Sequence, residues 1–399
     1  MADGQHGTAD AAAMVPLGED YREIRESIRA ICEKYPGTYW RGVEDADVYP
    51  EQFVQELTES GYLAALIPEE YGGSGLPIRA GAVILEEIHA SGCNAGACHA
   101  QMYIMGTLLR HGSEEQKRRY LPEIETGRLR LQAFGVTEPT TGSDTTKLKT
   151  RAVREGDRYI INGQKVWTSR ALQSDLMLLL ARTTSVEQVK RRTEGLSVFL
   201  VDMREARKQG MEIRKLQTMI NHQTTEIFFD NVPVPADCLI GEENKGFRYI
   251  LDGLNAERIL VAAEAIGDAH FFIRKASNYA NERVVFDRPI GANQGVQFPI
   301  ARAYAETRAA DLMNRAAAAL FDAGQPCGEE ANLAKLLASE AAWHAADTAM
   351  QTHGGFGYAR EYDVERKWRE TRIFQIAPIS TNLILSYLGQ HVLGMPRSY

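Results

Sequence analysis

The amino-acid sequence predicts a mainly α-helical protein with one β-domain in the middle of the chain. Apolar residues recur every three or four positions in the first and last parts of the 399 residues. In the middle part they alternate with polar residues, and glycine-containing turns separate the alternating runs. We therefore expect an N-terminal helical domain over residues 1–130, a middle β-barrel domain over 131–243 and a C-terminal helical bundle over 244–399.

The N-terminal region has the clearest helical periodicity in the stretches FVQELTESGYLAAL and GAVILEEIHA. The following stretch, GSEEQKRRYLPEIETG, predicts a helix that Ser113 caps. Glu114 and Glu115 then lie near the positive end of the helix dipole, where acidic side chains are stabilising.

The middle region has the alternation of half-buried strands. In AVREGDRYIINGQKVWTS, the pairs Gly156-Asp157 and Asn162-Gly163 are typical of hairpin turns. The stretches LMLLLAR, LSVFLVDM and TEIFFDNVPV continue the pattern, so we expect a compact antiparallel barrel or sandwich.

The C-terminal region is rich in alanine. The runs ARAYAETRAADLMNRAAAALFDAG and EEANLAKLLASEAAWHAADTAMQTHGG carry long apolar stripes, and each ends just before a glycine suited to a left-handed helix cap. Helices with such narrow faces predict a tightly packed bundle.

Charge and composition exclude several classes of protein. The net charge of −8 and the absence of a long Lys/Arg run make nucleic acid an unfavourable partner. Five widely spaced cysteines lack metal-site spacing, so we expect reduced core thiols and no metal. The N-terminus lacks the features of a secretory or organellar signal, and no apolar run approaches the roughly 18 residues of a membrane span. These features predict a cytoplasmic location.

Two motifs in the middle region combine small, hydroxyl-bearing and aromatic residues. AFGVTEPTTGSD spans residues 133–144 and INGQKVWTS spans 161–169. Small Gly142 and Ser143 let backbone donors approach a pyrophosphate closely, while Thr137 and Ser169 offer hydroxyls and Trp167 a stacking face. Each residue taken alone is more often structural. Together, and with the helical, β, helical order, the motifs resemble those of the acyl-CoA dehydrogenase family.

The resemblance implies FAD as cofactor and a four-helix bundle as the C-terminal domain. It implies FAD contacts from Phe134, Val136, Thr137, Gly142, Ser143, Trp167 and Ser169, with Ser143 also near the bound thioester.

A second set of implied FAD contacts lies in YANERVVFDRPIGANQGVQF and QTHGGFG. Arg283 resembles an arginine that reaches the partner subunit's FAD phosphates, so the family's usual tetramer is expected here. The other reading is a surface ion pair for Arg283 and a helix cap for the glycine pair. Asp287 stands where the family usually has glycine. The remaining implied contacts are Phe286, Gln294, Gln351, Gly354, Gly355 and Ser380.

The catalytic base of most family members is absent from its usual segment. That segment resembles Ile-Tyr-Glu-Gly-Thr in relatives, but here it reads RIFQIAPISTNLIL, which puts Pro378 or Ile379 at the base position. Residues 371–399 contain no Asp or Glu, so no local realignment restores the base.

Glu257, in GFRYILDGLNAERILVAAEAIG, is the candidate substitute. It matches the position of the base in isovaleryl-CoA and long-chain members, and apolar Leu254, Ile259 and Leu260 can raise its pKa by desolvation. The alternative is an ordinary Glu-Arg pair on an exposed helix surface. Arg258 matches a family residue at the ligand site, and Asn255 stands near the implied CoA position.

The helix spelled CNAGACHAQMYIMG lines the acyl pocket in relatives. His99 is a candidate for substrate binding there, and Gln101 and Tyr103 can make the pocket floor polar, although a single His or Tyr on such a helix is more often a core residue. Asn94 stands where glutarate-type members have Arg, which argues against a dicarboxylic substrate bound in their manner. Arg170 stands where the family tends to have Asn or Ser. It either binds an anionic group or is exposed to solvent, and we expect it to be exposed.

The resemblance implies FAD-dependent α,β-dehydrogenation of an acyl-CoA thioester, with electron-transfer flavoprotein as oxidant. The missing base motivates an alternative: other chemistry on the same fold, as in desulfinases or monooxygenases. A further alternative is a non-catalytic flavoprotein subunit.

Overall fold

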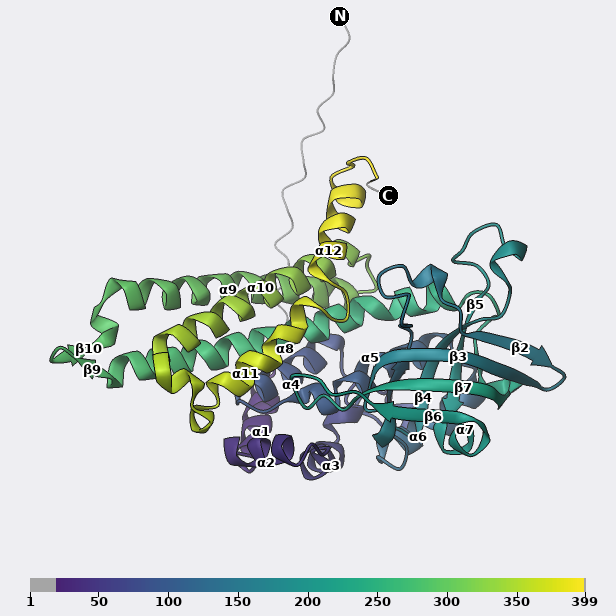
Figure 1. The fold of residues 1–399 in the computed structure, drawn as a ribbon, viewed down its shortest axis with the longest axis horizontal. Coiled ribbons are helices and arrows are strands. Elements are labelled where there is room, and N and C mark those ends of the chain that lie inside the picture. Colours follow the sequence, from purple (N-terminus) through teal and green to yellow (C-terminus); the bar gives the residue numbers. More distant parts are fainter. Residues whose placement is uncertain (1–18, 398–399) are drawn as a thin grey trace, which may run out of the picture.

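The protein has helices at both ends of its sequence and a β-domain between them. The computed structural model describes residues 19–397. Figure 1 shows the sheet at one end of an elongated molecule and the long C-terminal helices extending away from it. This confirms the predicted fold class. The prediction that the N-terminus is not a secretory signal concerns residues that lie mostly before residue 19, outside the described residues.

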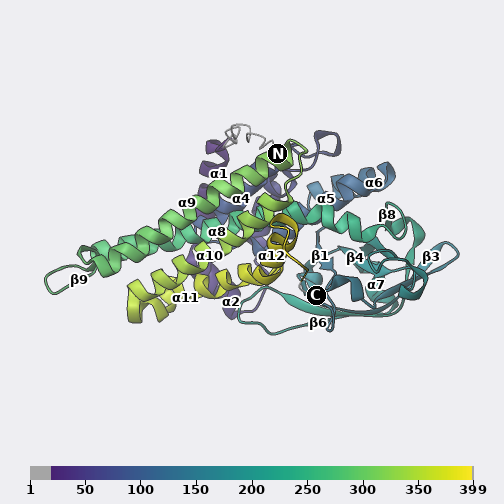
Figure 2. The same ribbon diagram turned by 90° about the horizontal axis from the view of Figure 1, so that it is seen from above.

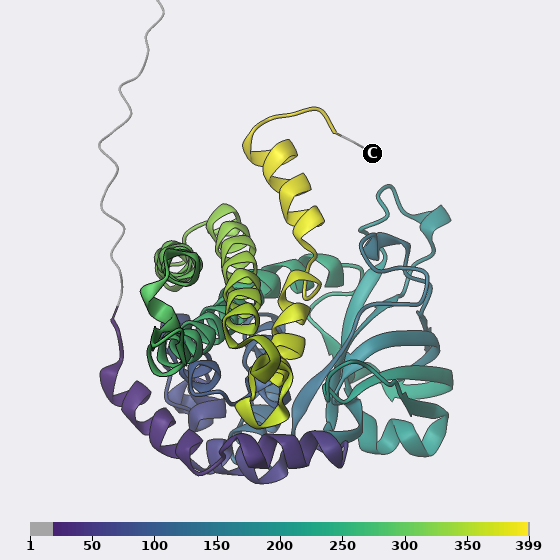
Figure 3. The ribbon, with the colours of Figure 1, turned by 60° about the vertical axis from the view of Figure 1, so that its left-hand side comes forward.

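The first helices of the chain, drawn in purple, form a layer along the bottom of the molecule in Figure 3. Ser113 caps α6 through a reciprocal pair of hydrogen bonds with Gln116, at 3.1 and 3.0 Å, which confirms the predicted cap. The central helix α4 is buried along its whole length because it packs against both the N-terminal layer and the C-terminal bundle. The helices are α1 (Arg22–Glu33), α2 (Gly37–Asp45), α3 (Glu51–Glu59), α4 (Ile78–Ala90), α5 (His99–His111) and α6 (Glu114–Glu125).

The middle region forms an eight-stranded sheet of order β6-β7-β3-β2-β4-β5-β8, with β1 also paired to β4. Most pairs are antiparallel, as expected. However, β1 and β2 both run parallel to β4. The prediction of an antiparallel barrel or sandwich is therefore wrong for these two strand pairs. The elements are β1 (Leu131–Gly135), β2 (Arg151–Glu155), β3 (Arg158–Ser169), β4 (Leu176–Arg182), β5 (Leu196–Asp202), α7 (Met203–Ala206), β6 (Met211–Lys215), β7 (Thr224–Pro235) and β8 (Leu239–Ile240).

One of the two predicted turns is correct. Gly156-Asp157 joins β2 to β3. Asn162-Gly163 lies inside the continuous strand β3, so its assignment as a turn is wrong. Gly163 has φ 150° at a register shift against β7, and a Cβ there would lie 2.5 Å from the Thr150 hydroxyl. The glycine therefore serves a β-bulge, which the dipeptide alone does not distinguish from a hairpin turn.

Strand β4 separates two hydrophobic cores because its side chains alternate between the faces of the sheet. Leu178 packs with residues of α5 and α6, whereas Leu179 packs with Phe199 and Ile227 in a core enclosed by the strands. The first core joins the sheet to the helical layer, and the second fills the β-domain.

The C-terminal bundle is built around α8, which packs against α4, α9 and α10. Buried alanines on α8 and α10 let these helices approach closely. Gly324 follows α9 with φ 67°, as the predicted left-handed cap requires. Gly354 caps α10 with φ 57° and ψ −129°, so the left-handed helical conformation expected there is wrong. The elements are α8 (Gly246–Glu282), β9 (Val284–Val285), β10 (Arg288–Pro289), α9 (Gln294–Asp322), α10 (Gly328–His353), α11 (Val364–Thr371) and α12 (Thr381–Tyr387).

Figure 2 shows α8 extending from the β-domain to the small β9–β10 hairpin, with α9 running back from that hairpin along the bundle. All five cysteines are buried and free, which confirms the prediction of core thiols. Within residues 19–397, no helix is both long and apolar enough to cross a membrane.

Candidate active site

The residues predicted to meet the flavin ring lie at one edge of the β-domain. Phe134 is on β1, and Thr137 follows two residues after that strand ends. The Thr137 carbonyl accepts a hydrogen bond of 2.9 Å from the Val166 amide of β3, which joins the two motifs. Trp167 is 62% exposed with φ 62°, so an apolar ring face is open to a ligand there. Val136 and Ser169 are half-buried beside these residues.

The predicted phosphate turn follows a buried anchor. The Glu138 carboxylate accepts the backbone amides of Lys149 and Thr150 at 2.6 and 2.8 Å and pairs with Lys165 at 2.9 Å. Gly142 and Ser143 are exposed beyond it, and a Cβ added at Gly142 would meet no atom within 4 Å. This open backbone fits the pyrophosphate of a dinucleotide. Sequence reasoning missed the Glu138–Lys165 pair, because nothing local to either motif indicates that they meet.

The second set of predicted FAD residues gathers at the far end of the bundle. Arg283 directly follows α8, and its guanidinium lies 5.7 Å from the ring centre of Phe356, just after α10. Phe286, between β9 and β10, is 93% exposed with φ 52°. The structure thus brings together the two C-terminal motifs: Arg283, Phe286 and Gln294 on one side, and Gln351, Gly354 and Gly355 on the other, all of them exposed.

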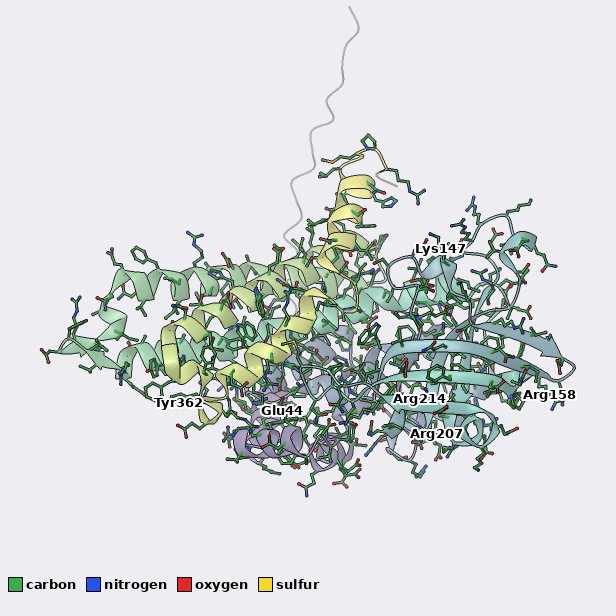
Figure 4. All side chains as sticks on the ribbon, in the orientation of Figure 1. Glu44, Lys147, Arg158, Arg207, Arg214 and Tyr362 are labelled. Atoms are coloured by element: carbon green, nitrogen blue, oxygen red, sulfur yellow. The ribbon has the colours of Figure 1, made fainter. Side chains whose placement is uncertain are left out.

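The two sets of FAD residues are separated by the length of α8. A helix of 37 residues is about 55 Å long. In Figure 4, Tyr362, which packs against Phe356, lies toward the far end of the bundle, and Lys147, which pairs with Asp144 beside the phosphate turn, lies on the β-domain. One chain therefore does not bring both sets to the same FAD, as expected if Arg283 serves a second subunit.

Glu257 is buried in α8, where its side chain faces the interior rather than solvent. It is 5% exposed, so the alternative of an exposed Glu-Arg pair is wrong. Burial raises the pKa of Glu257 to about 7 against the opposing effects of Arg258, a hydrogen bond from Tyr103 and the charge of Lys335. A carboxyl with this pKa can take or give a proton near neutral pH.

The side chains around Glu257 connect it to the C-terminal segment. Arg258 donates a hydrogen bond of 2.9 Å to Asn255, and the buried Arg258 Nε has no partner among residues 19–397. A buried donor without a partner fits a ligand contact. Lys335, which sequence reasoning missed, donates a hydrogen bond of 2.6 Å to the Ile379 carbonyl. The segment that lacks the usual base therefore lies beside the surroundings of Glu257. Ser380, half-buried, caps α12 through its hydroxyl.

His99 is held by a carboxylate of α8. Its Nδ1 lies 2.6 Å from Glu264, and its ring lies 5.6 Å from the ring of Tyr103. Glu264 lies seven residues, or two helical turns, after Glu257. This spacing puts both carboxylates on one face of α8 and could have indicated from the sequence that they share a site. His99 is 12% exposed by its side chain and faces the same polar interior as Glu257.

Arg170 is buried, which corrects the expectation of a solvent position. It is 2% exposed, and its Nη2 lies 3.0 Å from the His222 ring. The strand β3 ends at Ser169, and Arg170 then turns with φ 56°, which directs the chain into the protein. The local sequence after a strand does not show whether the next side chain points to solvent or into the protein, so the burial of Arg170 could not be predicted from it.

The fold and the site define an oxidoreductase of the flavoprotein class, and the comparisons with known proteins give its family. Three domain models match: the acyl-CoA dehydrogenase N-terminal domain over residues 18–128, the middle domain over 133–232 and the C-terminal domain over 244–391. The chain belongs to the acyl-CoA dehydrogenase family. Members of this family are flavoproteins that generally bind FAD and oxidise acyl-CoA esters.

Individual relatives align along nearly the whole chain. Acyl-CoA dehydrogenase FadE12 of Mycobacterium tuberculosis is 34% identical over 384 residues, covering 96% of this chain and 98% of the relative. The structure of butyryl-CoA dehydrogenase from Megasphaera elsdenii has a TM-score of 0.88 at 28% identity and covers 94% of this chain and 98% of that one. A structure described as an electron transferring flavoprotein of Acidaminococcus fermentans has a TM-score of 0.88 at 30% identity, covering 94% and 98%.

Proposed function

We propose that this protein is an FAD-dependent acyl-CoA dehydrogenase in which Glu257 is the catalytic base. The observation that carries the proposal is the buried Glu257 carboxyl, whose pKa is raised to about 7 mainly by burial. The C-terminal segment, residues 371–397, is joined to the surroundings of Glu257 by the hydrogen bond from Lys335 to the Ile379 carbonyl. This segment contains no carboxylate that can replace Glu257 as the base.

Bound FAD supplies the acceptor for the hydride that leaves the β-carbon of the acyl group. Glu257 takes the α-proton onto a carboxylate oxygen, so that both C–H bonds break and an α,β double bond forms. Tyr103 holds this carboxylate through a hydrogen bond, and Arg258, with its free Nε, orients the thioester ligand together with Asn255. Ser143 and His99 are proposed to contact the same ligand. The apolar surroundings exclude water, which keeps the carboxylate basic.

The FAD site is proposed to use Phe134, Val136, Thr137, Gly142, Ser143, Trp167 and Ser169 of one subunit, with Ser380. The partner subunit would supply Arg283, Phe286, Gln294, Gln351, Gly354 and Gly355. Large apolar side chains are exposed along this end of the bundle, which favours burial against another copy. They include Val284, Phe286, Phe298, Tyr304 and Tyr358. A tetramer, an electron-transfer flavoprotein as oxidant and a cytoplasmic location stay predictions.

The test is anaerobic bleaching of the purified protein across a panel of acyl-CoA esters. We expect the protein to be yellow with FAD bound non-covalently, and at least one ester to reduce the flavin without oxygen. Turnover of an ester without flavin reduction would instead favour the desulfinase-like or monooxygenase-like chemistry that the missing C-terminal base motivates. A protein that takes up no flavin would contradict both.

The rate of flavin reduction should depend on the ionisation of Glu257. A general base acts only when deprotonated, so kcat/KM should rise about tenfold per pH unit at low pH and level off above pH 7. Tyr103→Phe removes a hydrogen bond that lowers the pKa of Glu257, and this pKa should therefore rise. The midpoint of the profile should move to higher pH.

The matched control for this prediction is Tyr62→Phe, which removes a hydroxyl from a half-buried tyrosine of the N-terminal region, outside the proposed site and subunit contact. Its pH profile should coincide with that of the parent. A Tyr103→Phe midpoint that stays in place or moves to lower pH would show that the profile reports another group.

A further inference from the structure

Glu264 is a buried carboxylate that the proposed dehydrogenation does not use. It is 1% exposed and lies on α8, where it meets one histidine of α4 and one of α5. A carboxylate taken out of water is costly unless nearby cations and hydrogen bonds stabilise its charge. The groups around Glu264 therefore decide whether it is charged, and its distance from Glu257 decides whether that charge acts on the base.

Three groups from three different elements stabilise the charge of Glu264. On α5, His99 Nδ1 lies 2.6 Å from one carboxylate oxygen, and on α4, His89 Nε2 lies 3.9 Å from the other. Arg170, buried directly after β3, adds an attractive positive charge. Burial opposes ionisation, but these three groups, His99 first among them, hold the pKa of Glu264 below its usual value. Glu264 is therefore an anion at neutral pH.

The other titratable groups near this carboxylate leave its charge in place. Asp268, one turn further along α8, is held by Lys367 at 2.6 Å and by His89 at 2.8 Å. Tyr103 of α5 and Cys98, just before α5, are buried beside the carboxylate, and burial raises the pKa of both groups. Both are therefore uncharged near neutral pH, and neither offsets the charge of the carboxylate.

Glu264 and the proposed base make two neighbouring contacts between α8 and α5. Glu264 pairs with His99, and one turn further along α5, Tyr103 hydrogen-bonds to Glu257. The rings of His99 and Tyr103 lie 5.6 Å apart. The two carboxylates are seven residues apart on one face of α8, a rise of about 10 Å at 1.5 Å per residue. Leu260, which lies between them on that face, is fully buried, so protein rather than water separates them.

A fixed charge at this distance changes the proton affinity of the base. Two charges about 10 Å apart in a buried region, with an effective dielectric constant of about 20, shift a pKa by about one unit. Burial is the main effect that favours the protonated form of Glu257, and the charge of Glu264 adds to it. Arg258 of α8, Lys335 of α10 and the hydrogen bond from Tyr103 favour the ionised form. Glu264 therefore opposes the two cations near the base.

We propose that Glu264 is a positioning residue for the dehydrogenation: held as an anion by His99, it keeps Glu257 basic enough to take the α-proton at neutral pH. This inference rests on the proposed function and names a residue that tunes its base. Without this anion, the cations near Glu257 would leave a carboxylate that ionises at lower pH and binds the α-proton more weakly. The effect of Glu264 reaches the ester only through Glu257.

The experiment compares the pH dependence of kcat/KM for flavin reduction in the parent protein and in Glu264→Gln. The ester is whichever of butyryl-CoA, hexanoyl-CoA and octanoyl-CoA reduces the parent flavin fastest. Glutamine keeps the volume of the side chain but removes its charge and leaves Arg170 without this counter-charge, and both changes favour the ionised form of Glu257. We expect the midpoint near pH 7 to move to lower pH by about one unit. The plateau above it should fall, because a weaker base takes the proton more slowly.

Two further variants separate the charge of Glu264 from its other effects. Glu264→Asp keeps the charge, so its midpoint should stay closer to that of the parent than the midpoint of Glu264→Gln. Glu340→Gln removes an exposed carboxylate of α10, and its profile should coincide with that of the parent. A lower rate at an unchanged midpoint in Glu264→Gln would mean that the residue only supports the fold, and the proposal would be wrong.

A measurement on Glu257→Gln keeps the proposal testable if Glu264→Gln does not fold. Infrared difference spectra between pH 6 and pH 8 detect buried carboxyls that gain a proton. The parent should show a carboxyl band that titrates near pH 7, and Glu257→Gln should lack it, because Glu264 stays ionised in this range. A titrating band in Glu257→Gln that shifts on adding Glu264→Asp would overturn the proposal, since the charge of Glu264 would then not be fixed.

The outcomes distinguish this inference from the proposed function. If Glu257→Gln reduces its flavin at the parent rate, the proposed base is wrong and this inference fails with it. If Glu257→Gln is slow but the midpoint of Glu264→Gln stays in place or moves to higher pH, Glu257 remains the base and only the role of Glu264 is wrong.

Discussion

Replacing Glu257 with glutamine should slow flavin reduction by acyl-CoA about 100-fold to 10,000-fold, which is the usual contribution of a general base. Glu257→Gln keeps the volume and most hydrogen-bonding capacity of the side chain but removes the basic oxygen. FAD content and acyl-CoA affinity should therefore survive. Stopped-flow bleaching under anaerobic conditions measures the chemical step, and ester titration of the oxidised flavin spectrum measures binding.

Glu340→Gln is the matched control for this change, because it removes an exposed carboxylate from α10 in the same bundle. It should reduce its flavin at the parent rate. Reduction at the parent rate in Glu257→Gln would exclude proton abstraction by this residue and favour other chemistry on the same fold. In the Glu257→Gln background, Pro378→Glu should restore partial activity if residue 378 occupies the base position of the other family members.

Replacing Arg283 with glutamine should lower FAD affinity about 30-fold or more, since the phosphates lose a paired charge-assisted contact. The Arg283→Gln protein should lose flavin during gel filtration while keeping its oligomeric state. Arg288→Gln is the matched control, because Arg288 lies in the same hairpin and its side chain bonds to Asn293 at 2.7 Å. It should retain FAD like the parent.

A mixed oligomer tests whether Arg283 acts on the partner subunit. Ser143→Glu puts an unwanted carboxylate in the phosphate turn of one chain, and Arg283→Gln weakens the other chain. If each FAD site uses both subunits of a symmetric pair, random mixing should leave about a quarter of the sites intact. Recovery of FAD binding on mixing two defective chains is thus the expected result. No recovery in verified mixed oligomers would contradict the cross-subunit role.

The helical ends and the central sheet were predictable because their signals are local. Helical spacing in GAVILEEIHA and alternation in LMLLLAR each reflect a periodic buried face, and each produced the expected element. The Ser113 cap was predictable for the same reason. The prediction of a hairpin turn at Asn162-Gly163 was wrong because a β-bulge and a hairpin turn both require an unusual backbone conformation. The choice between them depends on β7, which pairs with β3 from more than sixty residues away.

The family resemblance and the absence of a carboxylate in the C-terminal segment follow from the amino-acid sequence alone, because motifs and missing residue types are read directly from the chain. The burial of Glu257 and its pKa of about 7 follow only from the packed fold, since desolvation depends on every element that packs against α8. The packed fold also separated the two sets of predicted FAD residues along that helix. Finally, it put Arg170 beside Asn94 and His222, because a long-range contact between the end of β3, the turn before α5 and the segment before β7 is set by packing rather than by local pattern.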